Sequence, residues 1–135
     1  MAIVAYGSED WTIRKTEQQK LQAFEMKTLR RMLGIRWQEH RTNESILQET
    51  GYSRQLVNVI KKRKLQYAGH VMRKAESLEK TIIQGSVPGR RGKGRPRKSW
   101  MDDLKEWTGL DVQQINKIAI NRNKWKKVVN NVAKH

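Results

Sequence analysis

The sequence predicts a mostly α-helical protein, and two observations carry that prediction. Capping residues and glycines repeatedly bracket stretches in which apolar residues recur at helical spacing. Runs that alternate between apolar and polar residues, as half-buried strands do, are not found along the 135 residues. We therefore expect a small helical bundle and a C-terminal helical subdomain, joined by a flexible basic loop.

Three helices are expected in the first half, over Glu17–Leu33, Asn43–Thr50 and Arg54–Arg73. Gly34 and Gly51 follow the first two as stop signals, and Ser53 is placed to cap the third. The first helix carries an apolar stripe that we expect to be core rather than a binding groove, formed by Leu21, Phe24, Leu29, Met32 and Leu33.

Strand is expected at most as a vestige, near Ile3–Tyr6 or Thr81–Gln84, and Leu78–Ser86 is expected to be a short strand or irregular. Three helices should follow the basic loop: Trp100–Thr108 behind a Ser99 cap, Val112–Ala119, and a last helix from Asn121 or Arg122 to about Ala133. A small second core is expected on their apolar faces, from Trp100, Leu104, Trp107, Ile115, Ile118, Trp125, Val128, Val129 and Val132.

Positive charge is the strongest feature of the composition. The net charge is +16, and residues 51–98 alone hold fourteen basic and two acidic side chains. A phosphate backbone is the expected partner for such a surplus. An anionic membrane is the rival partner, which we disfavour because the basic stretch lacks interleaved large apolar residues. With no cysteine, no signal sequence in the short Met1–Tyr6 run and no apolar span, we expect an intracellular, nuclear protein.

The segment Pro88–Trp100 concentrates this charge. Its prolines and glycines exclude a stable helix, so the cationic side chains are free to meet a polyanion and to be ordered by it. Lys93-Gly94-Arg95-Pro96 resembles a hook that enters the minor groove of A·T-rich DNA, although such hooks usually have Arg where Lys93 stands. General phosphate binding and a plain basic linker are the alternatives. The candidate contacts here are Arg90, Arg91, Lys93, Arg95, Arg97 and Lys98.

A second cationic cluster lies on the predicted Arg54–Arg73 helix and just after it. Because its first four members span a full helical turn, we expect them to encircle the helix and bind phosphates: Lys61, Lys62, Arg63 and Lys64, with Arg73 and Lys74. The short helix, glycine turn and long basic helix also have the outline of a helix-turn-helix, which is a common arrangement and weak support for base reading.

Catalytic and cofactor sites are not expected. Asp102 and Asp103 resemble the paired aspartates of polymerases, but they open a helix behind a cap, where carboxylates suit the helix dipole. His40, His70 and His135 are too scattered for a metal or triad set. We therefore expect no metal, no cofactor and no enzymatic activity.

Five motifs, taken in order, resemble the C-terminal region of reverse transcriptases from non-LTR (LINE-type, jockey-like) retrotransposons. They are Tyr6–Thr12 after the palm, Phe24–Leu33 in the thumb helix, Arg63–Arg73 in the basic helix, Gly94–Trp100 with Asp102 and Asp103, and Ala119–Trp125 in the final helix. Asp10 stands where Thr is usual, and Asn121 and Asn123 where Asp is common. The fingers, the catalytic palm and any endonuclease are absent from this sequence.

The resemblance implies a region that grips template and primer while chemistry happens elsewhere. We therefore divide the chain into a thumb-like region (residues 1–86), the basic loop (87–98) and a C-terminal subdomain (99–135). The expected function is non-catalytic binding of DNA, RNA or their hybrid. Two alternatives stay open: a polymerase fragment that is active only with a polymerase core supplied in trans, and a remnant without a selected function.

Overall fold

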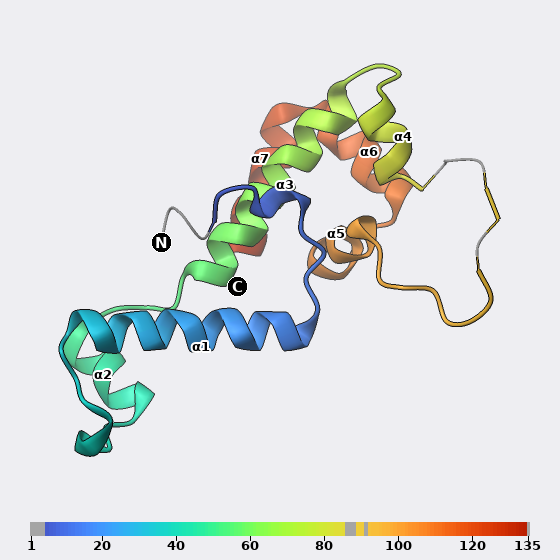
Figure 1. Ribbon diagram of the computed structural model, residues 1–135. Coiled ribbons are helices and arrows are strands. Elements are labelled where there is room, and N and C mark those ends of the chain that lie inside the picture. Colours follow the sequence, from blue (N-terminus) through green and yellow to red (C-terminus); the bar gives the residue numbers. More distant parts are fainter. Residues whose placement is uncertain (1–4, 86–88, 91, 135) are drawn as a thin grey trace. The chain divides into compact units, whose positions relative to one another are not determined.

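The computed structural model describes residues 5–85, 89–90 and 92–134, and these form seven α-helices and two short 3-10 turns with no strand (Figure 1). The 3-10 turns are η1 (Ser8–Asp10) and η2 (Trp37–Glu39). The helices are α1 (Lys15–Met32), α2 (Asn43–Thr50), α3 (Leu56–Arg73), α4 (Leu78–Ile83), α5 (Trp100–Thr108), α6 (Val112–Ile120) and α7 (Arg122–Lys134). The predicted mostly α-helical fold class is confirmed.

Local capping explains where several helices begin and end. The Ser99 hydroxyl accepts from the amide of Asp102, whose carboxylate accepts from the Ser99 amide at 2.7 Å. Gly109 ends α5 with a φ of 68°, so α5 has the bounds that the sequence predicted. The α2 bounds were also predicted, and the structure adds Thr42 as the cap, which the sequence analysis did not name.

Strand or irregular structure was expected in two segments, residues 78–86 and residues 3–6. The structure differs in the first, and it describes only part of the second. Residues 78–83 are helical as α4, because the Ser77 hydroxyl accepts from the Lys80 amide and starts a helix where a strand or irregular segment was expected. Ser86 is not among the described residues. Half of the segment Ile3–Tyr6, where at most a vestige of strand was expected, also lies outside them, and its described part, Ala5 and Tyr6, forms a turn.

The chain has two compact units, residues 14–57 and residues 1–13 with 58–135. These boundaries differ from the functional regions expected at 86 and 99. In the smaller unit the buried Glu25 carboxylate accepts hydrogen bonds from the Tyr52 hydroxyl at 2.7 Å and from the amides of Gln55 and Leu56 at 2.9 and 3.1 Å. Glu25 of α1, rather than the predicted Ser53, therefore satisfies the amides at the start of α3.

The apolar stripe of α1 is core only in part. Met26 is buried, and Leu21 and Leu29 are half-buried. Phe24 and Leu33 are exposed, and Met32 is 78% exposed, so the expectation that the whole stripe is core was wrong. The smaller unit of about forty residues offers too little apolar surface to cover one face of an 18-residue helix.

The larger unit contains the hydrophobic core that the C-terminal helices were expected to form. Residues of α3 join residues of α5, α6 and α7 there: Leu65, Ala68, Met72, Met101, Leu104, Ile115, Ala119, Trp125 and Val129. The indole nitrogen of Trp125 donates to the Leu65 carbonyl at 2.8 Å, which ties α7 to α3. Gly69 makes this approach possible, because a Cβ there would lie 2.3 Å from the Trp125 ring.

Candidate nucleic-acid interface

A cationic groove lies where α3 and α7 pack around Trp125. Its volume is about 490 Å³, and among the residues that the structure describes its lining holds four Lys or Arg side chains, one histidine and no carboxylate. The lining residues are Lys62, Gln66, His70 and Arg73 of α3, with Arg122, Trp125, Lys126, Val129 and Asn130 of α7. An uncompensated cationic hollow is the kind of surface that an anionic backbone can neutralise. We call this feature the α3–α7 groove.

Helical spacing explains why these side chains share one surface. Lys62, Gln66 and His70 follow one another at intervals of four on α3, and Arg122, Lys126 and Asn130 do the same on α7. Trp125 and Val129 fill the space between the helices and form the apolar floor of the groove.

Arg73 is held in place at one end of the groove. Its guanidinium donates to the Ala119 carbonyl at 3.0 Å, near the last turn of α6. Burial, followed by repulsion from the neighbouring Arg122, lowers the pKa of Arg73, although arginine stays charged at neutral pH. The two guanidiniums therefore create a region of positive potential, and a bound anion would reduce the repulsion between them.

The predicted cluster on α3 does not encircle the helix as a set of free cations. Lys62 is exposed and lines the groove. Lys61 is half-buried, with its ammonium 5.6 Å from the centre of the Trp107 ring, and Arg63 donates to the Ala5 carbonyl at 2.8 Å. Lys64 is fully buried.

Burial of Lys64 removes it from the candidate phosphate contacts. Its ammonium forms an ion pair with the equally buried Asp103 carboxylate and donates to the Trp11 carbonyl at 2.6 Å. It also lies 4.9 and 5.3 Å from the ring centres of Trp100 and Trp107. The expectation that Lys64 binds phosphate was wrong, because a helix that packs on one side must turn one residue of every full turn inward.

The remaining predicted contacts differ in how freely they reach solvent. Lys74 is exposed and pairs with Glu79 at 3.1 Å. Arg90, Lys93, Arg95 and Arg97 are exposed, and Arg91 lies outside the described residues. Lys98 is partly buried and pairs with Asp103 at 2.7 Å and Glu106 at 2.6 Å. Burial opposes its charge, but hydrogen bonds to both carboxylates and their attraction raise the pKa of Lys98.

The two aspartates that resemble a polymerase pair have structural partners. Asp103 is shared between Lys64 and Lys98, and its carboxylate also accepts from the Ile13 amide at 2.9 Å. The backbone hydrogen bond from Ser99 is the main reason that the pKa of Asp102 is lowered. Over residues 5–85, 89–90 and 92–134, no group of three or more His, Cys, Asp or Glu side chains is arranged to hold a metal ion.

Sequence reasoning missed Arg122 and Lys126 as candidate contacts. The signal that would have found them is the interval of four between Arg122, Lys126 and Asn130, on the same helix as the apolar Trp125 and Val129. It was overlooked because the net charge of residues 99–135 is only +3, although α7 holds five of the seven basic side chains of that region and none of its four acidic ones. The groove depends on where the α7 cations point rather than on the net charge of the region.

The described residues form a strongly basic helical chain with a cationic groove. Comparison with known proteins finds that the chain is similar to a transposon-derived protein. The chain is 30% identical over 137 residues to an uncharacterized transposon-derived protein of Caenorhabditis elegans. That match covers 93% of this chain and 49% of the relative, so the chain spans about half the length of the protein it matches. The similarity fits a transposon origin.

No protein-family model matches the chain, and no solved structure matches it. Among the helices that the structure describes, none is both long and apolar enough to cross a membrane.

Proposed function

We propose that this chain is a non-catalytic nucleic-acid-binding module that grips the phosphate backbone of a template/primer-like duplex through the α3–α7 groove. The observation that carries the proposal is the lining of that groove, which over the described part of the chain has four Lys or Arg side chains and no carboxylate. Phosphates on a backbone repeat at short intervals, so a row of cations on two packed helices can neutralise several of them together.

The groove is expected to contribute more of the binding affinity than the basic loop, because its helices and one of its arginines are held in place. Arg73 is fixed by its bond to Ala119, and α3 and α7 are joined through Trp125 and Leu65. Cations already held in place lose little conformational freedom on binding. The loop cations Arg90, Lys93, Arg95 and Arg97 are exposed side chains that lose rotamer freedom when they bind, so each should add less.

The transposon-derived relative and the motif resemblance support a more specific origin within this proposal. We infer descent from the thumb and post-palm tail of a non-LTR retrotransposon reverse transcriptase, with DNA, RNA or their hybrid as partner in the nucleus. A polymerase core acting in trans is a further partner that this origin allows. A membrane is not part of the proposal.

The salt dependence of duplex binding tests the proposal. Fluorescence anisotropy should measure affinity for DNA, RNA and hybrid duplexes across a series of salt concentrations. Replacing Lys62 and Lys126 together with Gln should flatten the slope of log affinity against log salt by nearly two units, because each neutralised phosphate of B-form DNA contributes about 0.9.

A matched control keeps the net charge change the same. Lys20→Gln with Lys27→Gln removes two exposed lysines from α1, outside the groove, and should change the slope much less. Equal slopes for the groove variant and the control would refute the groove as the interface. Binding by the unaltered chain that does not weaken with salt would refute backbone binding altogether.

A further inference from the structure

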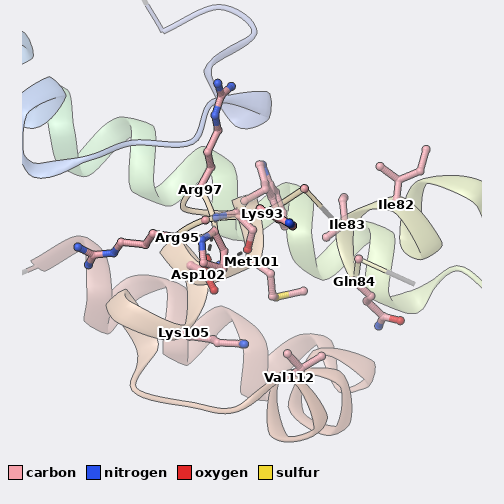
Figure 2. Close-up of a pocket in the computed structure, with 16 residues that line it drawn as sticks. Ile82, Ile83, Gln84, Lys93, Arg95, Arg97, Met101, Asp102, Lys105 and Val112 are labelled. Carbon is pink, nitrogen blue, oxygen red and sulfur yellow. Dashed lines mark hydrogen bonds between the residues drawn. The ribbon is translucent and has the colours of Figure 1, made fainter. Parts of the chain in front are cut away.

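A second hollow in the larger unit is lined by the basic loop together with α4, α5 and α6 (Figure 2). Its volume is about 700 Å³, within the range of small-ligand sites. Of the described residues, none lines both this hollow and the α3–α7 groove. We call it the loop cavity.

The loop cavity has apolar and cationic parts. Ile83, Met101 and Val112 contribute apolar side chains from three different helices. The ammonium groups of Lys93 and Lys105 extend toward these side chains, whereas the guanidiniums of Arg95 and Arg97 extend away from them (Figure 2). Met101 is buried and belongs to the hydrophobic core, so it joins the cavity to that core.

Asp102 is the one carboxylate among the described lining residues, and it already forms a hydrogen bond. Its carboxylate accepts a hydrogen bond from the Ser99 amide at 2.7 Å as part of the α5 cap. The cap fixes that carboxylate at the helix end, where it also attracts Lys105. The described lining still has four Lys or Arg side chains against this one carboxylate, so it remains net positive. The cavity therefore offers an apolar surface beside two lysines, with two outward arginines along its rim.

We propose that the loop cavity binds an unpaired nucleotide at the end of a nucleic-acid strand. This inference rests on the proposed function, because it takes the strand from the duplex that the groove holds. An unpaired base has wide apolar faces that need cover from water, and its phosphate is an anion directly beside them. Ile83, Met101 and Val112 cover the base, Lys93 and Lys105 bind its phosphate, and Arg95 and Arg97 meet the phosphates that follow.

A strand end fits better than a continuous duplex for a steric reason. Bases inside a duplex are stacked and paired, so only their edges are accessible, and a base must leave the stack to enter a cavity. An overhanging nucleotide is already free of its partner and enters at the lowest cost. The loop cavity thereby gives the chain a preference that phosphate contacts alone cannot supply.

The test compares two probes of equal sequence, a blunt duplex and the same duplex with a short unpaired overhang. Fluorescence anisotropy of the full chain should show roughly five- to tenfold tighter binding to the overhang, as expected when one base is covered. Lys93→Gln with Lys105→Gln should reduce that preference to near one. Arg95→Gln with Arg97→Gln removes the same amount of charge from the rim. This double variant should bind both probes more weakly but keep most of the preference for the overhang.

A second pair of variants tests the apolar part of the cavity. Ile83→Asp places a carboxylate among the base-covering side chains and should abolish the overhang preference. Leu78→Asp makes the same change on the same helix at a residue that is 75% exposed and outside the lining, and should leave the preference intact. Circular dichroism melts of all four variants verify that each is folded.

The outcomes separate this inference from the proposed function. Salt-dependent binding that is equal for the two probes overturns the loop cavity alone. Loss of salt-dependent binding to both probes overturns the proposed function. Displacement of the overhang by free nucleoside monophosphate at the concentration of the probe would assign the cavity to a free nucleotide and overturn its assignment to a strand end.

Discussion

The side chains of Lys64 and Asp103 form an ion pair in which both are fully buried. The pair joins α3 to α5, and the Ile13 amide and the Trp11 carbonyl connect it to the N-terminal segment. Lys98 reaches the same carboxylate from the end of the basic loop. One buried carboxylate therefore holds together parts of the chain that are up to 90 residues apart in sequence.

Breaking this pair from one side should destabilise the larger unit strongly. Asp103→Leu leaves the Lys64 ammonium buried without its counter-charge, and we expect the free energy of unfolding to fall by about 3–5 kcal/mol. The double change Lys64→Met with Asp103→Leu should cost much less than the sum of the single changes, because no charge is left unpaired. Chemical denaturation measures both. Lys62→Met, at an exposed site two residues away, is the control, and a loss below about 1 kcal/mol for Asp103→Leu contradicts the interpretation.

A methyl group at Gly69 should separate α3 from α7. The added Cβ would lie 2.3 Å from Cδ1 and Nε1 of Trp125, so the indole ring must move. That movement strains the hydrogen bond from the indole to the Leu65 carbonyl. We expect Gly69→Ala to lower stability by about 1–3 kcal/mol, although alanine favours a helix over glycine elsewhere.

The same substitution in open space provides the comparison for Gly69. Gly92→Ala places its Cβ with nothing within 4 Å and should leave the melting temperature unchanged. Thermal melts followed by circular dichroism measure both variants. A Gly69→Ala variant more stable than the unaltered chain would show that the helices separate without cost.

High pH should weaken the smaller unit through Tyr52. Burial and the hydrogen bond to Glu25 raise the pKa of Tyr52 from 10.0 to about 12. The folded state then holds this proton more tightly than the unfolded state, so the contribution to stability is complete below pH 10 and is lost as the pH rises toward about 12. Denaturation midpoints across this range should fall more steeply for the unaltered chain than for Tyr52→Phe. Tyr6→Phe, at an exposed residue, should keep the steep fall.

The chain should not extend a primer. With Mg²⁺, a primed template and nucleotides, we expect no product, because Asp103 is bound to two lysines and Asp102 caps α5. A gel-based extension assay measures this directly. Extension that disappears in Asp102→Asn would contradict the structural role of that carboxylate, and the same assay with a polymerase core added tests assistance in trans.

The sequence determined those features of the fold that depend on neighbours along the chain. The bounds of α2 and α5 follow from Thr42, Ser99, Gly51 and Gly109, because capping and helix termination act within a few residues. The helix α4 was within reach of the same reasoning, since Ser77 is a local cap that was overlooked. The surplus of positive charge, and hence the expected kind of partner, is also a property of the sequence alone.

Tertiary structure decided where side chains of equal charge point. Lys62 and Lys64 are two residues apart in one basic run, yet the first lines the α3–α7 groove and the second is buried against Asp103. Arg122 and Lys126 join Lys62 only because Trp125 packs against Gly69 and brings α7 to α3. Glu25, 31 residues from Leu56, satisfies the amide at the start of α3. Contacts of this kind depend on which helix faces meet, and that is set by burial of the whole apolar surface rather than by any local pattern.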